Sequence, residues 1–186
     1  MSAVSVATLG VAMMTGLSFA ASAIGTSISG TAAVGAMKKN KGAFGNYMVL
    51  SALPGSQGLY GLVGYFLISG YLVPGITPFQ AWMIFALGII LGAVGVISSY
   101  MQAKVCANGI AAIGNGHNVL GNTLILAAFP ELYSILAVAM VALFTGLMGD
   151  PVAGGANAEV ITNAVSYTNL KLPTKRRVYS PLVSLQ

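Results

Sequence analysis

The stretch that decides the fold runs from residue 119 to residue 148 and reads VLGNTLILAAFPELYSILAVAMVALFTGLM. Glu131 stands about midway along it, and the other two acids of the chain, Asp150 and Glu159, lie beyond it. An ionised carboxylate in hydrocarbon is costly, so such residues are rare and usually mark an ion path or a proton relay. No Lys or Arg lies at mid-depth in any apolar segment to neutralise Glu131. A functional role is therefore favoured over a structural one.

The composition is that of an integral membrane protein. Hydrophobic residues make up 56% of the chain and charged residues 6%, whereas about a quarter of the residues of a soluble domain are charged. Apolar segments longer than the ~20 residues that span a bilayer occur at 4–37, 43–69, 79–113 and 119–148. These segments lack the alternation expected of β-barrel strands. We predict an all-α membrane protein with four transmembrane helices.

Positive charge gathers in two of the connections between these segments. Three lysines lie within Lys38–Lys41, and Lys104 with His117 flanks the connection between the third and fourth segments, whereas residues 70–78 carry no charge. The positive-inside rule places the turns Lys38–Lys41 and Asn108–Asn118 in the cytoplasm and both termini outside the cell membrane. The net charge of +5 arises largely from this bias and a basic tail, so it does not indicate nucleic-acid binding.

The two halves of the chain resemble each other. A triplet of Gly, Ser and Ala at a spacing of four occurs twice, 70 residues apart, at Gly25, Ser29 and Ala33 and at Gly95, Ser99 and Ala103. Residues 58–63 match residues 131–136, at an offset of 73. The simplest account is a tandem duplication of a helical hairpin, with hairpins at 4–70 and 71–148 and a polar tail at 149–186. Gly58 is then the counterpart of Glu131, so two hairpins share one carboxylate.

Small residues spaced four apart give the first and third helices a narrow face, where another backbone can approach closely. The second and fourth helices are bulkier and carry aromatic residues such as Tyr60, Phe66, Phe129 and Tyr133. This asymmetry predicts a tightly packed inner layer and a looser outer layer in a symmetric homo-oligomer. The alternative is ordinary helix packing inside one chain.

Polar residues gather on the second helix, in the sequence LPGSQGLY at 53–60. Pro54 lacks a backbone donor and is expected to loosen the helix there. At ~1.5 Å per residue from the cytoplasmic helix ends, Gln57 lies about 20 Å deep, Glu131 about 18 Å and Gln102 of the third helix about 16 Å. We therefore expect both amides to meet the carboxylate at one level.

These groups supply oxygen atoms and one negative charge, which suits a hard monovalent cation better than a divalent one. Na⁺ could use one backbone carbonyl and four side chains, at Leu53, Ser56, Gln57, Gln102 and Glu131. A proton would need only Glu131 and a hydrogen-bond partner such as Tyr60. Each glutamine could instead make an interhelical hydrogen bond, but several polar groups around one acid favour Na⁺.

Three motifs, in order, carry a resemblance to a known family: LPGSQGLYG at 53–61, QAKV at 102–105 and ELYSIL at 131–136. Over roughly residues 5–148 the chain resembles the duplicated proteolipid, or c-type ring subunit, of V-type and A/V-type rotary ATPases, often called subunit K in bacteria. For sodium-translocating members, the resemblance implies an ion site with Tyr60 steadying the carboxylate and with ligands at Leu53, Ser56, Gln57, Gln102 and Glu131. Position 56 is more familiar as Thr in that set, and Ser retains the hydroxyl.

The resemblance also implies partners and a mechanism. Identical subunits would form a ring in the lipid bilayer that turns against a stator membrane subunit, whose essential arginine meets each Glu131 in turn. A central-stalk subunit would touch the turns Lys38–Lys41 and Asn108–Asn118. ATP would be hydrolysed in the soluble sector of the complex, so this chain would translocate ions without hydrolysing ATP.

Other functions stay open on the sequence. The same rotor could carry H⁺, and a stand-alone four-helix channel or secondary transporter would also use an intramembrane carboxylate. A purely structural four-helix protein gives no reason for an unpaired Glu131. Family members generally end soon after the fourth helix, whereas this chain continues with the polar segment 149–186.

Overall fold

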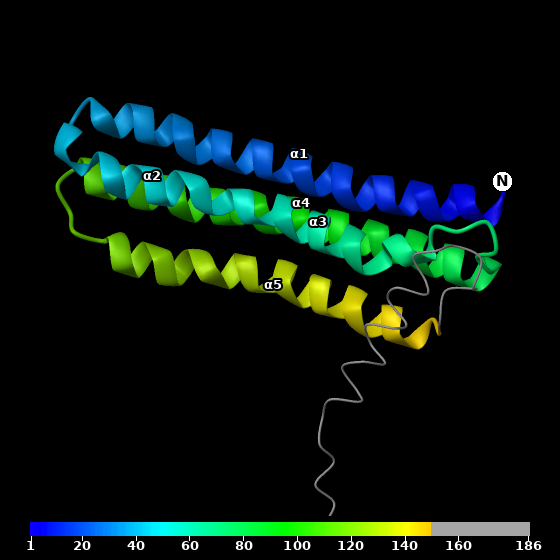
Figure 1. The fold of residues 1–186 in the computed structure, drawn as a ribbon. Helices are drawn as coiled ribbons and strands as arrows, with labels where there is room; N and C mark the ends of the chain where they lie inside the picture. The colour runs from blue at the N-terminus through cyan, green and yellow to red at the C-terminus, as the bar shows by residue number, and fades with distance from the viewer. Residues whose placement is uncertain (150–186) are drawn as a thin grey trace, which may run out of the picture.

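Four helical rods lie side by side in the computed structural model, which describes residues 1–149 (Figure 1). Three rods are single helices, α1 (Ala3–Met37), α4 (Pro78–Gly114) and α5 (Leu120–Leu147). The fourth rod combines α2 (Phe44–Ala52) with α3 (Ser56–Ile68). The predicted all-α architecture is therefore confirmed for this part of the chain. The predicted tail, apart from Gly149, lies outside the described residues.

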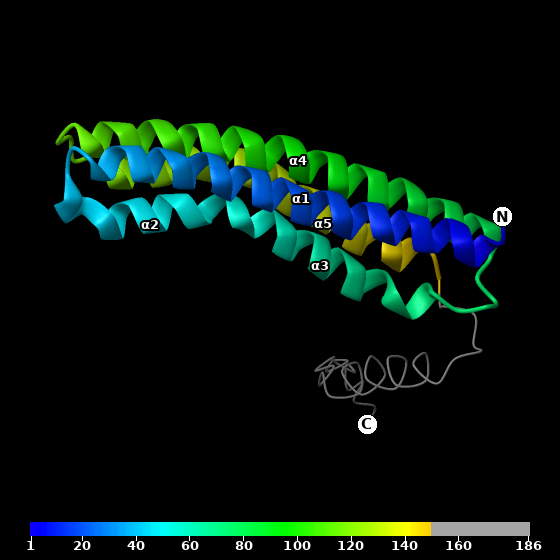
Figure 2. The same cartoon turned by 90° about the horizontal axis from the view of Figure 1, so that it is seen from above.

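The rod of α2 and α3 is divided by a short 3₁₀ turn, η2 (Leu53–Gly55). Pro54 has no N–H to continue the α-helical ladder, and the N–H of Ser56 instead bonds to the carbonyl of Leu53. The predicted loosening of this helix is therefore confirmed. Within residues 1–149, α1, α4 and α5 are each long and apolar enough to cross a membrane unbroken, and Figure 2 shows α2 and α3 following one another along the same bundle.

In cross-section, α1 and α5 occupy opposite corners of the bundle, and α4 and the α2/α3 rod occupy the other two (Figures 1 and 2). α1 packs along α4 and α3, and α5 packs along the same two helices from the other side. Both hairpins therefore contribute to one shared interior.

The closest helix contact depends on glycines. A Cβ atom added to Gly88 on α4 would overlap the carbonyl of Gly10 on α1, and one added to Gly25 would overlap Ser99. Small faces on α1 and α4 therefore allow close backbone approach, as predicted. These faces are buried inside one chain. The small residues therefore serve ordinary helix packing within one chain, which was the alternative interpretation. They give no evidence for the expected oligomer.

The register between α1 and α4 differs from the predicted offset of 70. The hydroxyl of Ser99 donates to the carbonyl of Ala21, 78 positions earlier in the chain. Since α1 and α4 run parallel, repeats of one hairpin should place equivalent residues at equal depth. Ser99 therefore lies level with Ala21 and Gly25, and its pairing with Ser29 was wrong by about one to two helical turns at 3.6 residues per turn.

Two apolar cores fill the bundle, one at each end. The core near the N-terminus includes Met14, Ile84 and Leu91, and the core near the interhelical turns includes Tyr47 and Ile110. Between these cores lies a layer of buried polar side chains: Ser18, Ser29, Gln57, Ser98, Ser99, Gln102 and Ser134. Burying polar groups is unfavourable unless they are hydrogen-bonded, so this layer marks the place where a site is built.

Both basic turns lie at the same end of the bundle, opposite the N-terminus (Figure 1). Helix α4 continues to Gly114, so the connection to α5 is shorter than the predicted turn Asn108–Asn118. The Nζ atom of Lys39 donates to Oδ1 of Asn115 at 2.8 Å and joins the two connections.

Candidate ion-binding site

Glu131 is half-buried on α5 and both of its carboxylate oxygens accept hydrogen bonds. The hydroxyl of Tyr60 on α3 donates to Oε1 at 2.7 Å. Nε2 of Gln102 on α4 donates to Oε2 at 3.0 Å. Within residues 1–149 no Lys, Arg or His lies within ion-pair distance of this carboxylate. The acid is therefore held by neutral donors from two other helices.

The two glutamines meet in the interior, as their predicted depths required. Nε2 of Gln57 donates to Oε1 of Gln102 at 2.9 Å. Both side chains are almost completely buried, with exposed fractions of 1% for Gln57 and 0% for Gln102. Gln102 therefore links Gln57 directly to Glu131.

A group of neutral oxygens extends the network from Gln57 into the η2 turn. The hydroxyl of Ser56 lies 3.1 Å from the carbonyl of Leu53 and 3.4 Å from Oε1 of Gln57. All the residues predicted for the site thus belong to one connected hydrogen-bond network, which runs through Leu53, Ser56, Gln57, Gln102, Glu131 and Tyr60.

Serines from the inner helices hold the η2 turn in place. Ser22 on α1 accepts a hydrogen bond from the N–H of Gly58 and donates to the carbonyl of Gly55. The hydroxyl of Ser99 on α4 lies 2.8 Å from the carbonyl of Ala21 and 2.9 Å from that of Pro54, and its one hydrogen is shared between them. These bonds satisfy backbone groups that the interrupted helix leaves without their usual partners. They fix the backbone from which Leu53 and Ser56 present their oxygens.

Ser98 is a contributor that the sequence analysis missed. Its hydroxyl accepts a hydrogen bond from Nε2 of Gln57 at 3.1 Å and donates to the carbonyl of Pro130 at 2.8 Å. The signal that could have identified Ser98 is its position four residues before Gln102, which places both on one face of α4. Ser134 on α5 is also buried in this layer, and its Oγ has no hydrogen-bond partner among the described residues.

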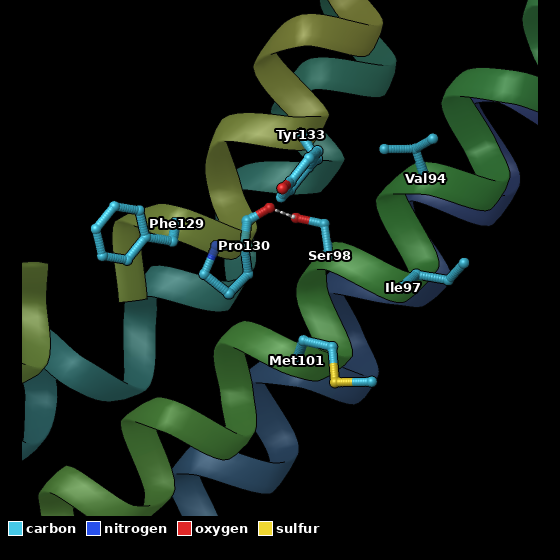
Figure 3. Close-up of a pocket in the computed structure, with 7 residues that line it drawn as sticks. All are labelled: Val94, Ile97, Ser98, Met101, Phe129, Pro130 and Tyr133. Atoms are coloured by element: carbon cyan, nitrogen blue, oxygen red, sulfur yellow. Dashed lines mark hydrogen bonds between the residues drawn. The ribbon is translucent and has the colours of Figure 1, made fainter. Parts of the chain in front are cut away.

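A groove of about 450 Å³ opens beside the site on the face formed by α4 and α5 (Figure 3). Ser98 and Pro130 lie between the other side chains that line the groove (Figure 3). Those other lining residues are Val94, Ile97, Met101, Phe129 and Tyr133. Ile97, Phe129 and Tyr133 are each about 60% exposed in the single chain, at 62%, 59% and 64%. This face suits lipid or another apolar surface.

The family model for the C subunit of ATP synthase matches the chain twice, over residues 9–68 and 85–144. The chain belongs to this family. The two matches confirm the predicted duplication of a helical hairpin. The two matches begin at residues 9 and 85, a separation close to that between Ala21 and Ser99. These matches do not support the predicted offset of 70 residues between the first and third helices.

Two curated relatives show which members of this family the chain resembles. The chain is 33% identical over 130 residues to the V-type sodium ATPase subunit K of Enterococcus hirae, covering 70% of this chain and 83% of that protein. It is 28% identical over 153 residues to the A-type ATP synthase subunit K of Methanocaldococcus jannaschii, covering 82% of this chain and 66% of that protein. The resemblance to a V-type proteolipid is therefore confirmed, and the chain is a multi-pass membrane subunit of this class.

Proposed function

We propose that this chain is the rotor subunit of a V-type ATPase and that it carries Na⁺ across the membrane on Glu131. The observation that carries this proposal is the single network that joins the carboxylate to Gln102, Gln57 and Ser56. It brings one negative charge and several neutral oxygens together between two apolar cores. The E. hirae relative is the subunit of a sodium ATPase, which supports the choice of ion.

The proposed Na⁺ site uses the oxygen atoms that the network already contains. A single carboxylate balances a monovalent cation, and neutral oxygens replace its water shell. The ligands would be the carbonyl of Leu53 and the side chains of Ser56, Gln57, Gln102 and Glu131. Gln102 would offer Oε1, the atom that accepts from Gln57, and its nitrogen would keep its bond to Oε2 of Glu131. Tyr60 would hold the other carboxylate oxygen, Oε1.

The mechanism follows from the cost of charge in hydrocarbon. A bare carboxylate is too unfavourable to pass lipid, so Glu131 must be neutralised before its subunit leaves the stator. Na⁺ enters from one half-channel, travels with the rotating ring, and leaves into the other half-channel beside the stator's essential arginine. ATP hydrolysis in the soluble sector drives the rotation. The basic turns at Lys38–Lys41 and beside Asn115 face the cytoplasm and meet the central stalk, and both termini lie outside.

The ring arrangement has a physical basis in the exposed α4/α5 face. Within the chain, the second hairpin covers one side of the first hairpin, and a duplicated chain should offer an equivalent side on its second hairpin. The groove lined by Ile97, Met101 and Phe129 is apolar and uncovered there. If the contact between the two hairpins of one chain is repeated between chains, a second copy of the chain covers this groove. Further repetition of the same contact closes a ring.

A rotor that carries H⁺ is the second candidate. The nitrogen of Gln102, and not its oxygen, faces Glu131 in the structure. Tyr60 and Gln102 each donate to Glu131, so the carboxylate is hydrogen-bonded without any cation. A proton-carrying site would use such bonds whenever its acid has released the proton. In that case the glutamines would act as structural hydrogen-bond partners.

Two measurements test the proposal at its separate levels. The intact mass of the detergent-extracted assembly tests the rotor assignment, and a stable monomer would contradict it. ATP-driven uptake of radioactive sodium into vesicles that contain the whole ATPase tests the ion. We expect uptake that persists when a protonophore removes the proton gradient, and uptake that requires a proton gradient would favour H⁺.

A further inference from the structure

We propose that Ser98 is a positioning residue for the Na⁺ site, and that it fixes the direction of the Gln57 amide. The inference rests on the proposed Na⁺ function and concerns a residue that is not among the predicted ligands. Ser98 is 4% exposed on α4 and contacts the site through Gln57 and through the backbone of Pro130.

The hydroxyl of Ser98 has one hydrogen to donate and lone pairs to accept. Its hydrogen goes to the carbonyl of Pro130 at 2.8 Å, as Figure 3 shows. Ser98 can therefore only accept from Gln57, whose Nε2 lies 3.1 Å away. The proline carbonyl on α5 thus determines which role the serine plays toward α3.

Gln57 is locked in one orientation as a consequence. An amide nitrogen carries two hydrogens, and those of Gln57 go to Ser98 and to Oε1 of Gln102. A rotated Gln57 amide would direct its oxygen at two acceptors. The oxygen of Gln57 is therefore held on the opposite side, where the hydroxyl of Ser56 lies 3.4 Å away.

This orientation is the one a cation needs. Oε1 of Gln57 is presented beside the hydroxyl of Ser56, which in turn lies 3.1 Å from the carbonyl of Leu53. Without Ser98, one N–H of Gln57 loses its acceptor, and the rotated amide becomes accessible. Ser98 therefore acts on the ion through Gln57, and it contributes no oxygen to the ion itself.

The test measures protection of Glu131 from carbodiimide by Na⁺ in the assembled ATPase, at fixed pH. Ser98→Ala removes the hydroxyl, and Ser98→Cys replaces it with a thiol of similar size that is a weak acceptor. We expect both variants to need about tenfold more Na⁺ for half-protection, the change that loss of ~1.4 kcal/mol produces for a buried hydrogen bond. Labelling without Na⁺ should keep its wild-type pH profile, because Ser98 does not contact the carboxylate.

Two comparisons separate positioning from general damage to the bundle. Ser18→Ala removes a buried hydroxyl that bonds to Met14 in its own helix, and it should leave half-protection unchanged. In a Gln57→Ala background, Ser98→Ala should add nothing, because no amide remains to be oriented. An additive loss in the double variant would overturn the positioning role.

The outcomes for this inference and for the proposed function differ. Protection of the wild type by Na⁺ together with unchanged half-protection in Ser98→Cys and Ser98→Ala would overturn the role of Ser98 and leave the Na⁺ site intact. Wild-type labelling that ignores Na⁺ would overturn both proposals. A shift in Ser98→Cys with wild-type behaviour of Ser18→Ala supports the inference.

Discussion

The hydroxyl of Tyr60 donates to Oε1 of Glu131 at 2.7 Å, across 71 positions of sequence. This bond joins α3 of the first hairpin to α5 of the second, so one hairpin carries the charge and the other steadies it. Gln57 and Gln102 are paired between the same two hairpins. Neither hairpin contains the site alone.

Replacing Tyr60 with Phe should make Glu131 more reactive toward carbodiimide. The phenol holds Oε1 of the carboxylate by a hydrogen bond of 2.7 Å, and its loss frees the carboxyl group to meet the reagent. A hydrogen bond to a charged group contributes about 1.5–3 kcal/mol, so labelling at fixed pH should rise about tenfold or more. Tyr133→Phe is the matched control, since Tyr133 is 64% exposed and lines the groove. Equal labelling in the two variants would remove Tyr60 from the site.

Replacing Glu131 with Gln should abolish ion transport and leave the assembly intact. Glutamine has nearly the same shape, and it carries no charge to bind a cation. Rotor mass by native mass spectrometry and sodium uptake into vesicles check the two halves of this prediction. Residual uptake above background would show that another group carries the ion.

Replacing Gln57 with Ala should weaken Na⁺ binding by about tenfold to a hundredfold, as expected for loss of a buried polar ligand and its hydrogen bonds. The change also leaves Oε1 of Gln102 without its donor. Assembly should persist, because the apolar cores on either side of the layer are untouched. A Na⁺ dependence equal to that of the wild type would exclude Gln57 from the ligands.

Replacing Gly88 with Ala should destabilise the bundle by about 1–3 kcal/mol or more, because overpacking of a tight contact forces backbone shifts. The added methyl group would meet the backbone of Gly10, which cannot rotate away. Gly16→Ala on α1 is the control, since a Cβ there meets nothing within 4 Å. Resistance to unfolding in detergent measures the difference. Equal resistance of the two variants would show that α1 and α4 do not need this close contact.

Much of the fold could be predicted because membrane-spanning helices are recognisable in a sequence as long apolar segments. The break at Pro54 was also predictable, since proline cannot donate in the helix interior. The register of α1 against α4 was not, because Gly, Ser and Ala recur at a spacing of four along both helices. Such a pattern matches itself at several offsets, and the Ser99–Ala21 bond selects one of them.

The residues of the site could be predicted from depth along the helices, which brought Gln57, Gln102 and Glu131 to one level. Ser98 could not be selected in the same way, because serine is an ordinary packing residue in membrane helices. The direction of the Gln102 amide was also beyond the sequence. Spacing places a side chain on a face, but the partners around it decide which amide atom faces the acid.

Equilibrium binding of radioactive sodium to the purified rotor assembly tests whether Glu131 holds Na⁺. We expect one Na⁺ bound per chain, binding that weakens as acid supplies protons that compete for Glu131, and no binding in Glu131→Gln. The stoichiometry follows from the single carboxylate shared by two hairpins. Absence of saturable Na⁺ binding to the wild type, or binding of equal strength in Glu131→Gln, would contradict the account.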